Sequence, residues 1–138
     1  MKEQVNHETV HHYTVQYREL HPKYGRDHIL GVIRGIGLCN DGRSRGLLVP
    51  SSNGQVRAML RAYQNSDVRP QDISYVECHA TGTSVGDSTE VLSMKEVYGK
   101  NPVYIASLKS NMGHLITAAG AAGLLKVLGA FENEYLPR

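Results

Sequence analysis

Apolar and polar residues are grouped along this chain so that strands and helices are expected to alternate. Three short apolar segments, rich in β-branched residues, predict buried strands at residues 29–38 (ILGVIRGIGL), 73–78 (ISYVEC) and 103–107 (VYIAS). Three other segments predict helices: residues 53–66, residues 87 or 88 to about 98, and residues 115–131. This order predicts an α/β fold, an incomplete βαβαβα layer in which helices cover a sheet.

The first 28 residues are polar and carry five of the seven histidines: His7, His11, His12, His21 and His28. On a helix, His7 and His11 would share one face and could bind a metal. No cysteine or carboxylate set completes such a site. We therefore interpret this segment as a solvated surface without chemistry.

The composition excludes several classes of partner. With 15 basic and 13 acidic residues the net charge is +2, and no basic stripe suited to a nucleic acid is present. Cys39 and Cys78 lie far apart without CxxC spacing, which fits a reducing cytoplasm better than a disulfide scaffold. The most apolar stretch, residues 115–130, is shorter than the ~20 residues of a membrane span and contains Lys126. Its AAGAAG segment indicates either close backbone packing or a cofactor, and packing is our default interpretation.

Two histidines are placed where chemistry is expected. His79 follows the second predicted strand and His114 precedes the third predicted helix, 35 residues later. Loops beyond the carboxyl ends of strands form the ligand sites of open α/β sheets. A neutral imidazole near a helix N-terminus can donate a hydrogen bond to a developing oxyanion.

Two other interpretations of these histidines stay open. In one, they are unrelated residues held by loop carbonyls; in the other, they form a metal site with Cys78. Adjacent strand residues point to opposite faces, so Cys78 and His79 are expected to diverge, which argues against the metal. An α/β hydrolase is also disfavoured, because no GxSxG motif occurs.

Two long motifs resemble those of the β-ketoacyl synthase family. The segment HATGTSVGDSTE is similar to HGTGTxxGDxxE, and SLKSNMGHLITAAGAAGLLKV is similar to KSNxGHxxxAAGxxGLxK. The resemblance covers residues 27–138, read as a partial ketosynthase domain of a polyketide or polyunsaturated fatty acid synthase, while residues 1–26 match weakly. It implies a thiolase-like fold, of which this chain is part of the C-terminal half.

The chain departs from the family pattern at three places. Ala80 stands where the family usually has glycine, which is tolerable if its φ is negative. The nucleophilic cysteine in its ACSS-like turn is absent, and neither Cys39 nor Cys78 corresponds to it. The late GFGGTNAH-like segment is also absent.

The resemblance implies roles for named residues in a decarboxylative Claisen condensation of acyl and malonyl thioesters. His79, His114 and Lys109 are the implied catalytic residues. Asn111 and Gly113 would shape the turn that aims His114. Glu90 matches the motif glutamate, although it also reads as the third residue of a capped helix.

The resemblance also implies partners. Thr81 and Thr83 would bind the 4′-phosphopantetheine arm of an acyl carrier protein, or they merely cap the loop. No bound cofactor and no metal are expected. The remaining parts of the ketosynthase domain and a second copy in a homodimer are the implied partners. The chain alone is expected to be inactive, and a non-catalytic ketosynthase-like partner is the alternative function.

Overall fold

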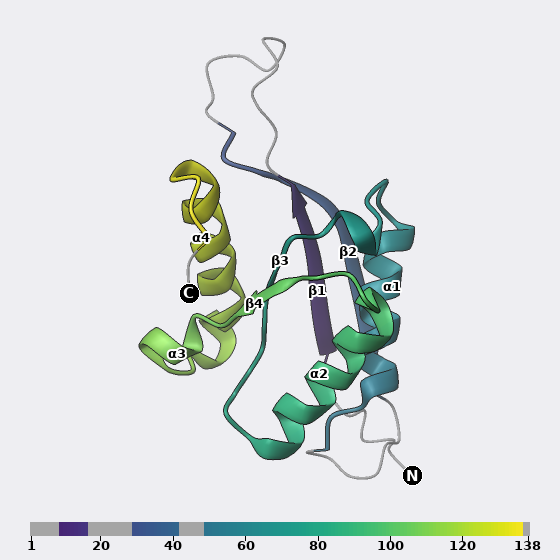
Figure 1. Ribbon diagram of the computed structural model, residues 1–138. Helices are drawn as coiled ribbons and strands as arrows, with labels where there is room; N and C mark the ends of the chain where they lie inside the picture. The colour runs from purple at the N-terminus through teal and green to yellow at the C-terminus, as the bar shows by residue number, and fades with distance from the viewer. Residues whose placement is uncertain (1–8, 17–28, 42–48, 137–138) are drawn as a thin grey trace, which may run out of the picture.

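The computed structural model describes residues 9–16, 29–41 and 49–136, in which strands and helices alternate as expected (Figure 1). The elements, in chain order, are β1 (Thr9–Gln16), β2 (Val32–Asn40), α1 (Ser52–Gln64), the 3-10 turn η2 (Pro70–Asp72), β3 (Tyr75–Glu77), α2 (Ser84–Tyr98), β4 (Tyr104–Ala106), α3 (Lys109–Met112), the 3-10 turn η3 (Ile116–Ala118) and α4 (Ala119–Glu132). The α/β class is confirmed.

The strands form two two-stranded sheets in the described part of the chain, where the sequence predicted one layer. In one sheet β1 is antiparallel to β2, and in the other β3 is parallel to β4. The strand β1 was not predicted, since we read this segment as a solvated surface. The same strand removes the shared helix face proposed for His7 and His11, because His11 lies in β1; His7 lies outside the described residues.

Strand β2 packs against α1 through positions without side chains. Gly35, Gly37 and Cys39 are buried along one face of β2, while alternate residues on its other face stay about half exposed. A Cβ atom on Gly37 would lie 1.8 Å from the carbonyl oxygen of Ala58 in α1. Only glycine allows the strand to approach the helix backbone this closely.

The core lies between α1, α2 and β3. Its buried residues are Met59, Tyr63, Cys78, Met94 and Tyr98. The hydroxyl groups of the two tyrosines are 2.9 Å apart and satisfy each other, as buried polar groups must. Burial raises the pKa of both phenols, most strongly that of Tyr98.

Two helices begin at residues other than those predicted. Helix α2 starts at Ser84 and its N-cap is Thr83, whose Oγ1 accepts the Gly86 N–H at 3.2 Å; the predicted caps, Asp87 and Ser88, lie inside the helix. The last helix starts at Ala119 rather than at Leu115, because η3 occupies the intervening residues. Both loops that carry the candidate histidines are thereby defined.

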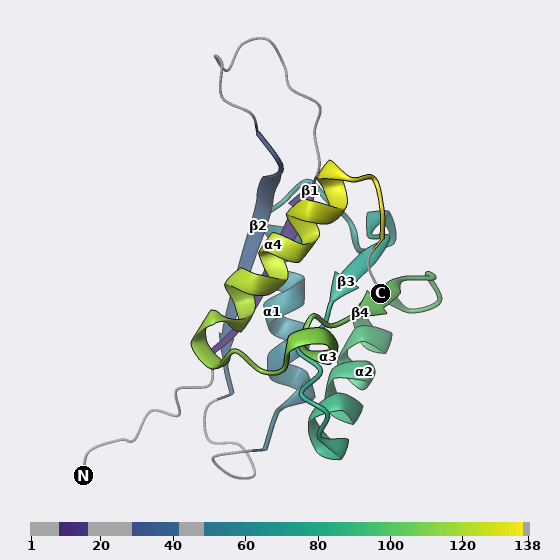
Figure 2. The same ribbon diagram turned by 90° about the vertical axis from the view of Figure 1, so that its left-hand side faces the viewer.

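In Figure 1 the β3–β4 pair lies between α3 and α4 on one side and α1 and α2 on the other, and Figure 2 looks onto the side of α3 and α4. The loops that leave β3 and β4 therefore sit between the two groups of helices.

In the described part of the chain, no helix has the length and apolar character needed to cross a membrane.

Candidate active site

His79 and His114 lie next to each other. Their ring centroids are 5.5 Å apart and the ring planes meet at 85°. His79 lies in the loop between β3 and α2, and His114 lies between α3 and η3. Both side chains are exposed, so a ligand can reach them. The predicted meeting of the two loops is confirmed by this contact, and a shared role of the two histidines stays a prediction.

The ring of His114 is held by the backbone that follows it. The N–H of Ile116 donates to His114 Nδ1 at 2.9 Å. An imidazole nitrogen that accepts a hydrogen bond carries no proton, so the proton of the neutral ring is on Nε2. His114 therefore presents an N–H donor at its outer nitrogen.

The turn around His114 needs unusual backbone angles. Gly113 has φ +77° and Ile116 has φ +50°. The first value suits glycine, whereas a β-branched residue with positive φ is strained. Gly113 also ends α3, its N–H bonding to the carbonyl of Lys109. The predicted role of Gly113 in shaping this turn agrees with that geometry.

The loop of His79 is tied to α2 by Glu90. One carboxylate oxygen accepts the N–H of His79 at 2.7 Å and the other accepts the N–H of Ala80 at 2.8 Å. Glu90 lies in the second turn of α2, because the helix starts at Ser84. The capping interpretation of Glu90 is therefore wrong, and the residue anchors the backbone that presents His79.

Ala80 adopts a left-handed backbone conformation, with φ +30°. An alanine was expected to be tolerable at this position only with a negative φ, and the observed φ is positive. A side chain at positive φ crowds the backbone and costs about 1–2 kcal/mol. The hydrogen bond to Glu90 helps to hold this strained residue in place.

The two cysteines are both buried and are not paired with each other in a disulfide. Cys78 points into the core, where its Sγ lies 3.8 Å from Met94 Sδ, while the neighbouring His79 is exposed, as predicted. Burial raises the pKa of the Cys78 thiol to about 12, with Glu90 and Glu77 adding to the effect. Cys39 Sγ accepts a hydrogen bond from Arg57 Nε at 3.2 Å.

A metal site is not supported among the residues that the structure describes. Within those residues, no three histidine, cysteine or carboxylate side chains are grouped as metal ligands. Cys78 turns away from His79, so the set of Cys78, His79 and His114 considered above does not form.

The two threonines of the His79 loop lie together. Thr81 Oγ1 and Thr83 Oγ1 are 3.2 Å apart, and Thr83 also caps α2. A hydroxyl group offers one donor and two acceptor sites, so the pair keeps capacity for a further partner.

Lys109 and Asn111 belong to the short helix α3 that precedes His114. The positive charge of Lys109 acts to lower the pKa of Cys78, against the larger effect of burial. Asn111 Oδ1 accepts a hydrogen bond from Ser110 at 3.2 Å. Both residues lie in the segment that leads directly to His114.

An ion pair next to this site was missed by the sequence analysis. Lys126 Nζ lies 3.0 Å from Glu77 Oε2, and both side chains are largely buried. The available signal was a carboxylate inside an apolar strand and a lysine inside an apolar helix, since buried charges require partners. The pairing of these two charges could not be predicted from the sequence.

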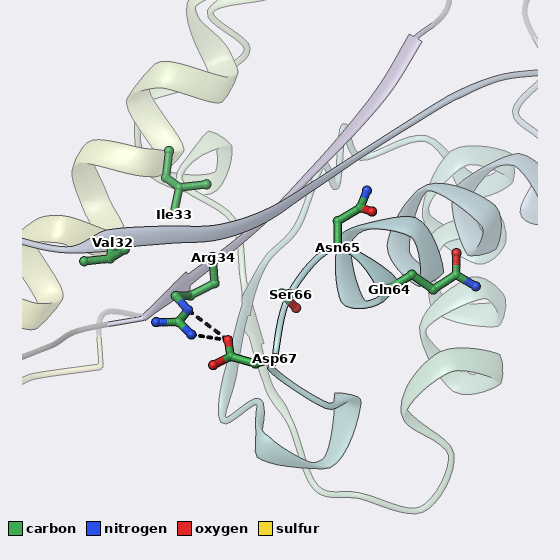
Figure 3. A pocket seen from close by; sticks show the side chains of 7 residues that line it. All are labelled: Val32, Ile33, Arg34, Gln64, Asn65, Ser66 and Asp67. Atoms are coloured by element: carbon green, nitrogen blue, oxygen red, sulfur yellow. Dashed lines mark hydrogen bonds and ion pairs between the residues drawn. The ribbon is translucent and has the colours of Figure 1, made fainter.

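An open hollow lies elsewhere, between the start of β2 and the end of α1 (Figure 3). It is lined by Val32, Ile33, Arg34, Gln64, Asn65, Ser66 and Asp67. Arg34 and Asp67 form an ion pair across it. None of the predicted site residues lines this hollow, so we do not assign it to the histidine site.

The family model and similar curated proteins point to one and the same family. Residues 30–138 match the family model described as "Beta-ketoacyl synthase, C-terminal domain". The chain is 39% identical over 114 residues to the hybrid PKS-NRPS synthetase pytA of Aspergillus terreus. It is 42% identical over 115 residues to the erythronolide synthase EryA3 of Saccharopolyspora erythraea. These matches take in 80% of this chain but 17% and 4% of the two relatives, so the chain spans less than a fifth of their length.

Solved structures agree. The PfaC keto synthase–chain length factor matches with a TM-score of 0.72 and 45% identity, over 75% of this chain and 12% of that one. The ketosynthase from module 6 of the bacillaene synthase of Bacillus subtilis matches with a TM-score of 0.74 and 39% identity, over 78% of this chain and 20% of that one. Both motifs quoted above lie inside the residues that match the family model.

Proposed function

Because this chain belongs to the β-ketoacyl synthase family, with the C-terminal domain at residues 30–138, we propose that His79 and His114 stabilise the enolate formed in a decarboxylative Claisen condensation. The observation that carries the proposal is the contact of the two rings, 5.5 Å between centroids, on exposed loops. The products would be β-ketoacyl thioesters for fatty acid or polyketide biosynthesis.

The reaction makes a specific demand on the two rings. A malonyl thioester loses carbon dioxide, and the electron pair of the broken bond moves into an enolate whose oxygen becomes negative. The Nε2–H of His114, fixed by the bond from Ile116 to Nδ1, is suited to donate to this oxygen. His79 would supply the second donor. Lys109 would add positive charge that favours the anion.

The enolate carbon then attacks an acyl group carried on a cysteine thiolate, which leaves as the new carbon–carbon bond forms. This nucleophile must come from residues outside this chain. Cys78 is held as a buried thiol with a pKa of about 12, and Cys39 is buried against α1. A nucleophilic cysteine needs a lowered pKa and access to substrate.

Substrate and partners follow from the same proposal. The carrier-bound thioester would enter along the Thr81–Thr83 hydroxyl pair, which would hydrogen-bond to the amides of the 4′-phosphopantetheine arm. An acyl carrier protein, the rest of the ketosynthase and a second copy of it would be the partners. Asn111 would support the turn that aims His114.

The test uses the full-length gene product and a malonyl-pantetheine thioester. We expect His79→Ala and His114→Ala each to lower the rate of carbon dioxide release about 100-fold or more, the effect typical of removing one oxyanion donor. Lys95→Ala, at an exposed position in the last turn of α2, is the control and should keep the wild-type rate. Release that is independent of both histidines would contradict the proposal, whereas no release by the wild-type protein would favour a non-catalytic ketosynthase-like partner.

A further inference from the structure

The carboxylate of Glu77 joins three parts of the molecule. Its Oε1 accepts the backbone N–H of Leu108, the residue just before α3. Its Oε2 accepts the hydroxyl of Tyr75 at 2.6 Å and pairs with Lys126 Nζ of α4 at 3.0 Å. Strand β3, the start of α3 and helix α4 are thus connected through one side chain.

This cluster is shielded from water. The side chains of Lys126 and Glu77 are 7% and 15% exposed, and the ammonium also lies 5.9 Å from the centre of the Tyr75 ring. Helix α4 packs closely here because it presents Gly123, where a Cβ atom would lie 3.1 Å from Glu77 Cγ. Hydrogen bonds to a charged acceptor are stronger than neutral ones, and a low local dielectric strengthens them further.

The position of Glu77 in the chain gives the cluster its significance. Glu77 is two residues before His79, and Leu108 is six residues before His114. The bond between them therefore links the stem of one histidine loop directly to the stem of the other. Glu90 fixes the His79 loop to α2, and Ile116 fixes the ring of His114 within its own loop. Neither of these contacts relates one loop to the other.

We infer that Glu77 is a positioning residue that sets the distance between His79 and His114 by holding the backbone of Leu108. Lys126 balances its buried charge. The inference rests on the proposed function, because the shared distance matters only if both rings serve one oxyanion. It concerns residues that do not themselves reach the substrate.

The experiment separates position from stability by exchanging the ion pair as a unit. Replacing a buried ion pair with apolar residues of similar volume is often tolerated, whereas removing one partner is not. In the full-length gene product, Glu77→Leu with Lys126→Met removes both charges together and leaves the Leu108 N–H without its acceptor. Glu77→Gln with Lys126→Met also removes both charges but keeps an amide oxygen for that N–H.

We expect the Leu/Met pair to lower the turnover number for carbon dioxide release at least tenfold, while acyl loading of the nucleophilic cysteine and the KM for malonyl thioester stay within twofold. The Gln/Met pair should recover to within about threefold of the wild-type rate. Asp67→Asn breaks a different ion pair, the one with Arg34 in the hollow of Figure 3, and should change neither step. If Glu77 had only a structural role, acyl loading and carbon dioxide release would fall together.

Hydrogen exchange provides a readout that does not depend on activity. Amides of residues 108–116 should exchange faster in the Leu/Met protein and return toward wild-type protection in the Gln/Met protein. Unchanged exchange, an unchanged rate in the Leu/Met protein, or no recovery in the Gln/Met protein would each overturn the inference. If the Leu/Met protein does not fold, Glu77→Asp replaces it: the charge stays, the reach shortens by one methylene, and a wild-type rate and exchange pattern would overturn the inference.

The two proposals fail separately. A wild-type protein that releases no carbon dioxide, or whose release survives His114→Ala, contradicts the proposed function. In that case the exchange of residues 108–116 still decides whether Glu77 holds the two loop stems together.

Discussion

The carboxylate of Glu90 accepts the N–H of Ala80 at 2.8 Å, and Ala80 itself has φ +30°. A residue of α2 thus holds, from 10 positions away in sequence, a backbone conformation that alanine disfavours. The second Glu90 oxygen binds the N–H of His79 in the same way. The strain next to the candidate histidine is therefore balanced by two hydrogen bonds to one carboxylate.

Ala80→Gly should stabilise the protein. Glycine adopts positive φ without the steric cost of a Cβ atom, so we expect the free energy of unfolding to rise by about 1 kcal/mol. The measurement is chemical denaturation. Ala121→Gly, at an exposed position inside α4, is the matched control and should destabilise by up to about 1 kcal/mol. Equal effects of the two substitutions would contradict the strain at Ala80.

Combining His79→Ala with His114→Ala should show that the two rings act as one unit. Groups that stabilise the same charge are non-additive, so we expect the double variant to lose little more than the worse single variant. The measurement is carbon dioxide release from malonyl-pantetheine by the full-length gene product. Losses that multiply would indicate that each ring works independently, contrary to their proposed shared oxyanion.

The buried thiol of Cys78 should make stability fall at alkaline pH. Its pKa is about 12 in the folded protein against an ordinary value of about 9, so the contribution is complete below pH 9 and is lost as the pH rises toward 12. Between pH 8 and pH 10 we expect the free energy of unfolding to fall by about 1 kcal/mol through this group.

The Cys78→Ala protein isolates the effect and should lack this part of the slope. Tyr63 and Tyr98, whose pKa values are also raised, add a further fall only above about pH 10. An identical pH dependence in the two proteins below pH 10 would rule out Cys78 as its origin.

Gly37→Ala should be among the most damaging small substitutions in this chain. The new methyl group would meet the Ala58 carbonyl oxygen at 1.8 Å, so β2 must move away from α1, at a cost of about 3 kcal/mol or more. Gly129→Ala in α4, where the new methyl group meets nothing within 4 Å, should instead stabilise by up to about 1 kcal/mol. Thermal unfolding compares the two, and similar shifts would contradict the close approach at Gly37.

The order of elements from β2 onward could be predicted from the sequence, because apolar periodicity reports which segments are buried. Strand β1 could not: its sequence, TVHHYTVQ, is rich in β-branched residues, but its histidines made the segment read as surface. Its pairing with β2 depends on the tertiary structure and cannot be predicted from the local sequence. The start of α2 was ambiguous for a similar reason, since Thr83, Asp87 and Ser88 are all good caps and only the folded loop selects one.

The candidate site divides in the same way. The motifs and the ends of the predicted strands were enough to bring His79 and His114 together. The positive φ of Ala80 is not a property that any motif carries, because the angle depends on where Glu90 anchors the loop. The ion-pair partner of Glu77 could not be predicted either. Lys126 is 49 residues away, and the sequence pattern requires only some buried cation, not this one.

The short ladder between β3 and β4 fixes the register of both histidine loops, which limits how this site can be transferred to another scaffold. It joins only three residue pairs, Tyr75 with Tyr104, Val76 with Ile105 and Glu77 with Ala106. Successive strand residues are about 3.3 Å apart and face opposite ways, so a one-residue slip would turn His79 inward and bring Cys78 to the surface. A graft of either loop onto another scaffold must therefore conserve the spacing from the last paired residue to its histidine as well as the residues of the loop itself.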